Sequence, residues 1–245
     1  MKAIILAAGL GRRLAPWTDG LPKCLLRLGG RSLLERMLDA VEAAGVSQAL
    51  VVVGHCQEQI RDRIGSRFRT VRIRYAENRD YMKGSLLSLW HAREALDGDC
   101  LVMDADVLFA PPLLKRLVDA PRPSALLLDP NFTDTGEEVK LYARGPRVLA
   151  LGKKVSPPAH DLVGEGVGFL KCGAIHAPAL RECLEEVRRE AGDGTEYEEA
   201  LDRLLRRVRV GWVDVAGLPW TEIDFPEDLS RAEREVVPKI EGQLA

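Results

Sequence analysis

The sequence predicts an α/β fold, in which a mostly parallel sheet is flanked by helices and antiparallel strands are added in the C-terminal half. Three observations support this fold class. Short apolar runs rich in β-forming residues alternate with amphipathic helical stretches from residue 2 to about residue 118. After residues 121–123, strand-like runs follow one another without full helices between them. Of the 245 residues, 46% are hydrophobic and 29% are charged, which is enough for one large core.

The first half of the chain alternates strands with helices. Buried strands are expected at residues 2–6, 49–53, 71–75 and 100–103. Helices are expected at residues 33–41, 57–64 and 86–96, because apolar side chains recur there at helical spacing. This alternation predicts a Rossmann-like half.

The second half begins with consecutive strands and returns to helices. Strands are expected at residues 125–128, 138–142, 148–151 and 166–170, joined by short turns, and we expect them to extend the first sheet in antiparallel fashion. Helices at 178–191 and 197–207, a strand at 210–215 and a final helix at 226–236 with proline in its first turn complete the chain. Residues 156–160 are expected to form a surface loop.

Charge and cysteine content exclude several classes of protein. The chain has 35 Lys and Arg against 37 Asp and Glu, and the formal net charge of −2 argues against a chain that coats nucleic acid. The five cysteines form no C-x-x-C pair, so no disulfide framework or zinc site is indicated and a cytoplasmic setting is expected. The N-terminal apolar run is too short for a signal peptide, and no stretch is suited to span a membrane.

The strongest local motif is a glycine-rich segment, Leu6 to Leu14, directly after the first expected strand. Small residues allow the backbone to approach a ligand, and Arg12, Arg13 and Lys23 add positive charge, so the segment predicts a polyphosphate site. It is not the dinucleotide fingerprint, because the third glycine would fall at Leu14, and no P-loop motif occurs.

Two acidic segments predict a metal site. Asp104 and Asp106 follow a buried strand, at the sheet edge where open α/β sheets bind ligands, and they face the same side if the strand persists. Oxygen ligands of this kind suit Mg²⁺. Residues 220–228 form a second acidic cluster before the final helix, and Asp224 is its better candidate ligand, since Glu227 and Asp228 are placed to favour the first helical turn.

Together these segments resemble the nucleotidyltransferases of the glycosyltransferase-A-like fold, whose signature L-A-A-G-x-G-x-R-L followed by P-K matches Leu6 to Leu14 and Pro22-Lys23. Within that family the chain is similar to the small CTP-dependent enzymes that act on phosphocholine, inositol-1-phosphate and 2-aminoethylphosphonate. The matching segments are Gly54 to Cys56, Asn78 to Leu89, Met103 to Asp106, Tyr197 to Leu201 and Trp220 to Asp224. The resemblance covers essentially the whole chain and implies one nucleotidyltransferase domain, with residues 1–120 as the nucleotide-binding half and 121–245 as the acceptor-binding half.

The resemblance also implies roles for individual residues. The implied nucleotide-binding residues are Leu6, Ala7, Ala8, Gly9, Gly11, Arg12, Lys23, Gly84, Ser85 and Asp104. The implied catalytic residues are Lys23, Arg13, Asp106 and Asp224, of which the two aspartates would share Mg²⁺. The implied acceptor-binding residues are Lys153, Glu165, Tyr197, Trp220 and Glu222, with Lys154 as an alternative to Lys153.

The expected reaction transfers CMP from CTP to a small phosphorylated alcohol or phosphonate and releases pyrophosphate. The aromatic and acidic side chains of residues 196–199 and of Trp220 and Glu222 suggest an acceptor with an amine or quaternary ammonium group, although these rings would equally suit the core. A sugar-1-phosphate nucleotidyltransferase that uses UTP, dTTP or GTP is the alternative, and a non-catalytic nucleotide-binding module is less favoured. No nucleic acid partner is expected, and the oligomeric state, a homodimer included, stays open.

Overall fold

A ten-stranded sheet forms the centre of the structure, a computed structural model that describes residues 1–242. Its parallel part consists of β1 (Lys2–Ala7), β4 (Gln48–Val53), β6 (Val71–Glu77) and β7 (Cys100–Asp104). The short strand β5 (Arg67–Phe68) pairs with β6 in antiparallel fashion. The strands β1, β4, β6 and β7 are the four that the first half of the sequence predicts.

The strands of the second half continue the same sheet. They are β9 (Ala125–Asp129), β10 (Lys140–Arg144), β11 (Arg147–Gly152) and β12 (Leu162–Cys172), and all of their mutual pairings are antiparallel. The long strand β12 joins the two parts, because it pairs with β7 on one side and with β10 and β9 on the other. A further strand, β13 (Gly211–Asp214), lies parallel to β9. The predicted mostly parallel sheet with antiparallel additions is confirmed.

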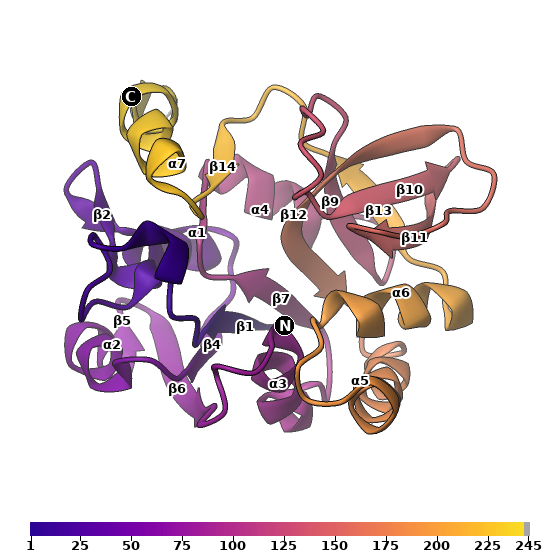
Figure 1. Cartoon of the computed structure of the whole chain (residues 1–245), viewed down its shortest axis with the longest axis horizontal. Helices are drawn as coiled ribbons and strands as arrows, with labels where there is room; N and C mark the ends of the chain where they lie inside the picture. The colour runs from indigo at the N-terminus through magenta and orange to yellow at the C-terminus, as the bar shows by residue number, and fades with distance from the viewer. Residues whose placement is uncertain (243–245) are drawn as a thin grey trace.

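Helices cover both faces of this sheet. Figure 1 shows α1 (Leu33–Ala43) and α4 (Pro111–Val118) above β1 and β7, and α3 (Ser85–His91) and α5 (Ala177–Ala191) below them. The helix α2 (Gln57–Ile64) packs with α1, and α6 (Glu198–Arg207) packs with α5. Successive side chains of β1 therefore enter different cores: Ala3 and Ile5 face the α1 side, and Ile4 faces the α5 side.

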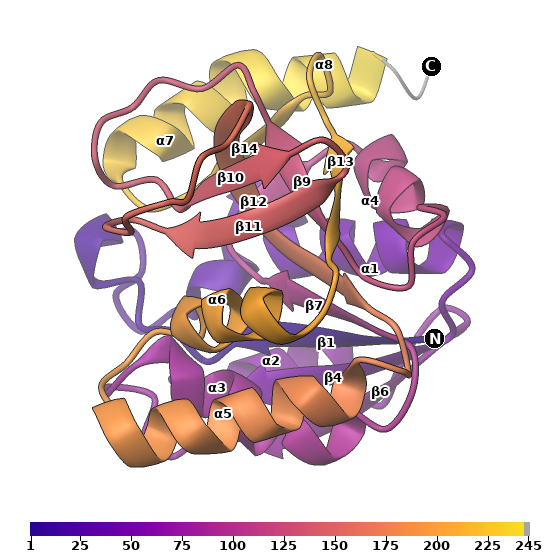
Figure 2. The ribbon, with the colours of Figure 1, turned by 90° about the vertical axis from the view of Figure 1, so that its right-hand side faces the viewer.

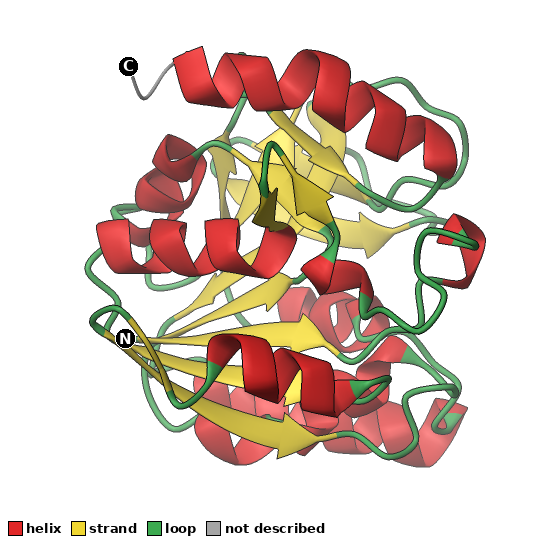
Figure 3. Ribbon diagram, turned by 90° about the vertical axis from the view of Figure 1, so that its left-hand side faces the viewer, coloured by secondary structure: helices red, strands yellow, loops and turns green. Residues whose placement is uncertain are grey.

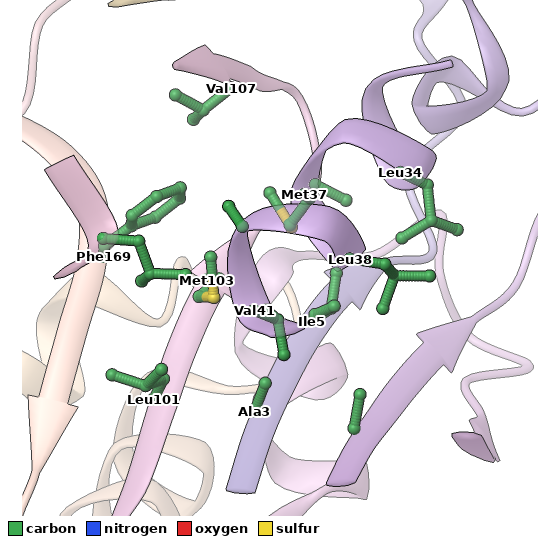
Figure 4. Close-up of a cluster of buried hydrophobic side chains, with 14 of the residues drawn as sticks. Ala3, Ile5, Leu34, Met37, Leu38, Val41, Leu101, Met103, Val107 and Phe169 are labelled. Carbon is green, nitrogen blue, oxygen red and sulfur yellow. The ribbon is translucent and has the colours of Figure 1, made fainter. Parts of the chain in front are cut away.

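The start of α1 is determined by a capping box. The backbone N–H of Glu35 donates to Ser32 Oγ at 3.2 Å, and the backbone N–H of Ser32 donates to Glu35 Oε2 at 2.9 Å. Figure 4 shows the result, in which Met37, Leu38 and Val41 of α1 point onto the strands beneath the helix.

The C-terminal part brings a distant segment to the carboxyl end of β7. After β7 the chain forms β8 (Val107–Phe109), which pairs with β14 (Trp220–Glu222) in antiparallel fashion. The helix α7 (Pro226–Arg231), a π-helical turn (Ala232–Val236) and α8 (Val237–Gly242) follow, beside the hairpin of β2 (Arg27–Leu28) and β3 (Arg31–Ser32). In Figures 2 and 3 these helices run across the end of the molecule that lies opposite α5.

Most expected elements are confirmed. The differences are one helix that is longer than expected and several short elements that were not predicted. The final helix does not end at residue 236 but continues through the π-helical turn to Gly242. The pairs β8–β14 and β2–β3, the helix α4 and the 3₁₀ helices Arg12–Leu14 and Lys23–Leu25 were not predicted. No helix in the described part of the chain has the length and apolar character required to cross a membrane.

Candidate active site

A large cleft opens at the carboxyl ends of β1 and β7 and has a volume of about 1070 Å³. Apart from Lys154, every residue that the sequence analysis assigned to the nucleotide, the acceptor or the metal lines this cleft. They are Leu6, Ala7, Ala8, Gly9, Gly11, Arg12, Arg13, Lys23, Gly84, Ser85, Asp104, Asp106, Lys153, Glu165, Tyr197, Trp220, Glu222 and Asp224. Lys154 is not among the lining residues, so the geometry favours Lys153 of the two alternatives.

The glycine-rich segment forms one wall of the cleft. Gly11 has a φ of 62°, a left-handed conformation that favours glycine, and its carbonyl accepts a hydrogen bond from Thr18 Oγ1 at 2.9 Å. A Cβ at Gly11 would lie 3.2 Å from Lys23 Cβ, so the loop and the lysine stem pack closely. The following 3₁₀ turn directs Arg12 and Arg13 to the cleft.

Lys23 lies between two carboxylates that come from distant parts of the chain. Its Nζ donates to Asp106 Oδ2 at 2.8 Å and also to Asp224 Oδ1. Burial alone would lower the pKa of Lys23, but the charges of Asp106 and Asp224 outweigh it and raise that pKa. Arg13 Nη1 lies 3.5 Å from Asp224 Oδ2, so Lys23 and Arg13 both compensate the negative charge of this carboxylate.

Three carboxylates form a group with the dimensions of a cation site. Asp106, Glu222 and Asp224 each offer an oxygen, and these oxygens all lie within 4.8 Å of one another. Asp106 Oδ1 is buried and has no hydrogen-bond partner among the described residues. The structure thus brings the two predicted metal ligands, Asp106 and Asp224, together with Glu222, for which the resemblance implies a role in acceptor binding.

Asp104 does not share the orientation of Asp106, because β7 ends at Asp104 and the chain turns before β8. The condition for a common face, a strand that persists to Asp106, is therefore not met. Asp104 Oδ2 instead accepts a hydrogen bond from Tyr197 Oη at 2.6 Å. Burial, reinforced by the charge of Asp106, raises the pKa of Asp104 well above its usual range.

Tyr197 connects the two walls of the cleft. Its backbone N–H donates to Ser85 Oγ at 2.9 Å, while the N–H of Ser85 donates to Glu196 Oε2 at 3.1 Å. The tyrosine is only 4% exposed and packs in the core next to α6. The ring therefore has little free face to offer a cation, although its residue lines the cleft.

The wall from the second half of the chain is strongly acidic. Its acidic lining consists of Asp129, Glu137, Glu138, Glu165, Glu196, Glu198, Glu222, Asp224 and Asp228. Burial raises the pKa of Glu198 to about 7, and within residues 1–242 the buried Glu198 Oε2 has no hydrogen-bond partner. Burial, with the charges of Glu138 and Asp129, also raises the pKa of Glu165 to about 7. The basic lining residues of this wall are Lys153, whose Nζ lies 3.6 Å from Glu137 Oε2, and Arg231.

Sequence reasoning missed several lining residues of this wall. Asp129 accepts a hydrogen bond from Trp220 Nε1 at 2.8 Å, and this bond fixes the indole at the cleft wall. Arg231 contacts Asp228 Oδ1 at 2.9 Å and donates to Thr221 Oγ1 at 2.7 Å. Neither Asp129 nor Arg231 belongs to a recognisable local motif, because both reach the cleft only through the pairing of distant strands and the docking of α7.

Comparison with known proteins agrees with this geometry. The family model of the MobA-like NTP transferase domain matches residues 3–160, which include the glycine-rich loop, Lys23 and Asp106. The chain belongs to this family. This membership agrees with the resemblance that the sequence motifs indicate.

Two relatives extend the similarity to nearly the whole chain. The CMP-5′-(3-aminopropyl)phosphonate synthase of Streptomyces rubellomurinus is 32% identical over 99% of this chain, and 40% of its own length is covered. The bifunctional IPC transferase and DIPP synthase of Rubrobacter xylanophilus is 32% identical over 96% of this chain and 52% of its own length. The chain thus spans about half or less of these two relatives.

A solved structure shares the fold of this chain. The inositol-1-phosphate CTP transferase from T. maritima superposes with a TM-score of 0.77 over 100% of this chain and 97% of its own, at 21% identity. This similarity covers the antiparallel second half as well as the parallel first half, so the whole sheet arrangement is shared.

Proposed function

We propose that the protein transfers the cytidylyl group of CTP to a small phosphonate or phosphate that carries an amine or quaternary ammonium group. The observation that carries this proposal is the arrangement of one cleft, in which Lys23 joins Asp106 and Asp224 between the glycine-rich loop and an acidic wall. Membership of the NTP transferase family supports nucleotidyl transfer, and the relative named as a CMP-aminopropylphosphonate synthase supports CTP and an aminophosphonate.

The proposed reaction is a displacement at the α-phosphorus of CTP. An oxygen of the acceptor's phosphonate or phosphate forms a new P–O bond, and the bond from the α-phosphorus to the oxygen that bridges it to the β-phosphate breaks. Pyrophosphate leaves with the electron pair of that bond. The attacking oxygen is already anionic at neutral pH, so the reaction needs no general base, and alignment and charge neutralisation supply the catalysis.

The basic residues of the first wall would neutralise the phosphates. Lys23 would contact the α-phosphate, because its stem already packs against Gly11 in the loop assigned to the triphosphate. Arg12 and Arg13 line the same wall and would hold the β- and γ-phosphates, which leave as pyrophosphate. The backbone of Gly84 and Ser85, on the same cleft, would lie by the base.

Asp106, Glu222 and Asp224 would hold Mg²⁺, because their oxygens are grouped within 4.8 Å and Asp106 Oδ1 has no other partner. When bound, the ion would act as a Lewis acid on phosphate oxygens. The three carboxylates would remain fixed by β8 and β14, whose pairing aligns Glu222 with Val107.

The acidic wall supports an amine-bearing acceptor. Glu165 and Glu198 line the cleft, and Glu198 Oε2 is buried without a hydrogen-bond partner among the described residues. A cationic group would neutralise the charge of both side chains, whereas a neutral polyol would donate hydrogen bonds to them without a positive charge. Lys153, on the same wall, would contact the acceptor's phosphonate or phosphate.

The proposal is tested by a matrix of CTP, UTP, dTTP and GTP against a panel of acceptors, with pyrophosphate release as the readout. We expect 2-aminoethylphosphonate, 3-aminopropylphosphonate, phosphoethanolamine or phosphocholine with CTP to be used far better than inositol-1-phosphate or glucose-1-phosphate. Use of glucose-1-phosphate with another nucleotide, and of no amine with CTP, would favour the sugar-nucleotide alternative. Binding of nucleotide without pyrophosphate release for any acceptor would favour the non-catalytic alternative.

A further inference from the structure

The ammonium group of Lys23 uses the same carboxylates that would hold a divalent cation. Its Nζ lies 2.8 Å from Asp106 Oδ2 and contacts Asp224 Oδ1, and its side chain is only 11% exposed. Asp106 and Asp224 are also two of the three members of the carboxylate group that could hold an ion. The lysine and an ion therefore share two ligands.

Two cations that share the same carboxylate ligands repel each other. In a cleft with limited solvent, a divalent ion placed on Asp106 and Asp224 would lie within a few ångströms of the ammonium, and the repulsion would be large compared with that in water. The lysine also takes up part of the negative charge that would attract the ion. Strong ion binding thus requires that the ammonium first finds another anionic partner.

The nucleotide would supply that partner without a change in the backbone. The stem of Lys23 packs on Gly11, since a Cβ at Gly11 would lie 3.2 Å from Lys23 Cβ and 3.6 Å from Lys23 Cγ. The α-phosphate assigned to this loop would therefore lie within reach of the ammonium after rotation about side-chain bonds alone. Arg12 and Arg13 line the same region and would stabilise the phosphate charge there.

We propose that Lys23 acts as an internal competitor of the divalent cation, so that the ion binds strongly only when the triphosphate has taken over the lysine. This inference rests on the proposed metal-dependent nucleotidyl transfer. It makes the affinities for ion and nucleotide depend on each other, and linkage requires that each ligand strengthens the other by the same factor. Lys23 is then a catalytic residue that also controls when the ion site is available.

The test measures ion binding directly, with Mn²⁺ titrated into the whole protein and free Mn²⁺ followed by electron paramagnetic resonance. Titrations are made with and without α,β-methylene-CTP, and a protein-free series accounts for Mn²⁺ held by the nucleotide alone. For the native protein we expect binding at least about 10-fold tighter with the analogue. For Lys23→Met we expect binding without the analogue to be at least about 10-fold tighter than in the native protein.

Two variants separate competition by Lys23 from a general effect of charge. Lys23→Arg keeps the positive charge and should bind Mn²⁺ about as weakly as the native protein without nucleotide. Lys83→Met removes a lysine that lines the same cleft but pairs with Asp80 and Asp193, so Mn²⁺ affinity should change less than about 2-fold. Lys23→Gln serves as the second neutral variant if thermal unfolding shows that Lys23→Met does not fold.

Three outcomes would overturn the inference. Equal Mn²⁺ affinity of the native protein and of the neutral Lys23 variants would show that the lysine does not compete. An equal gain in Lys83→Met would assign the effect to the general charge of the cleft. Absence of Mn²⁺ binding in every protein, with nucleotide as well, would overturn the metal part of the proposed function too, whereas the first two outcomes leave that proposal intact.

Discussion

Asp106 has two oxygens in different environments. Oδ2 accepts a hydrogen bond from Lys23 at 2.8 Å, whereas Oδ1 is buried and receives no hydrogen bond from the part of the chain that the structure describes. A buried anionic oxygen without a partner destabilises the folded protein unless a ligand compensates it. Asp106 is therefore expected to contribute more to ligand binding than to stability.

We expect Asp106→Asn to lower the turnover number by roughly 10²- to 10³-fold, because the amide is a poor ligand for a hard cation. The fold should persist, since the amide has the same shape and Asp106 Oδ1 makes no hydrogen bond. Steady-state rates at saturating Mg²⁺, together with a thermal unfolding curve, check both parts. Near-native turnover would show that Asp106 does not hold the ion.

Glu165 gives the cleft a predicted pH dependence. Its pKa rises from 4.5 to about 7 in the folded protein, through burial and the charges of Glu138 and Asp129. The folded state thus holds this proton more tightly than the unfolded state. The contribution of Glu165 to stability therefore falls as the pH rises from about 4.5, and it is lowest above about pH 7.

Replacement of Glu165 by Gln should remove this dependence. We expect the Tm of Glu165→Gln to exceed that of the native protein by roughly 2–6 °C at pH 8 and to match it near pH 4.5. Scanning calorimetry at both pH values provides the measurement. A difference in Tm that is the same at pH 8 and pH 4.5 would mean that titration of Glu165 is not its cause.

At the scale of elements, the start of α3 is joined to the loop before α6. The backbone N–H of Leu86 donates to the carbonyl of Thr195 at 3.1 Å, and Ser85 exchanges hydrogen bonds with residues 196 and 197. Gly84 allows this approach, because a Cβ there would lie 2.5 Å from the carbonyl oxygen of Thr195. This junction therefore connects the nucleotide wall of the cleft to the acceptor wall.

We expect Gly84→Ala to reduce the free energy of unfolding by about 1–3 kcal/mol, since a backbone carbonyl cannot move aside as a flexible side chain would. Gly98→Ala is the matched control, because a Cβ at Gly98 meets no atom within 4 Å. Urea unfolding of both variants gives the comparison. If Gly84→Ala is as stable as the control, the two segments do not need this close contact.

At the scale of the whole molecule, β12 makes the two halves of the chain interdependent. It pairs with β7 of the parallel part and with β10 and β9 of the antiparallel part, so one sheet extends through both. Removal of the second half would leave the edge of β7 unpaired and the apolar residues that pack on it exposed. The predicted halves are thus expected to form one cooperative unit.

We expect equilibrium unfolding in guanidinium to follow a single transition. Far-UV circular dichroism reports the whole sheet, and tryptophan fluorescence reports both halves, since Trp90 lies in the first and Trp212 and Trp220 in the second. The two signals should give the same midpoint. Two separated transitions would indicate that residues 1–120 and 121–245 fold as independent units.

The sequence by itself determined the features that depend on local physical chemistry. Strands and helices follow from the spacing of apolar side chains, and the polyphosphate loop follows from small residues next to basic ones after the first strand. The candidate roles of Lys23, Asp106 and Asp224 came from the resemblance of whole motifs, and each of these residues lines the cleft.

Only the tertiary structure decided how these residues combine. The pairing of β8 with β14 brings Glu222 and Asp224 to Asp106, and the docking of the loop before α6 aligns Tyr197 with Asp104. Such contacts join residues far apart in the chain, and they depend on how complete elements pack, so no local period or turn signal encodes them. The same reason explains why the position of Glu222 beside Asp106 and Asp224 was not predicted and why Asp129 and Arg231 had no signal in the sequence.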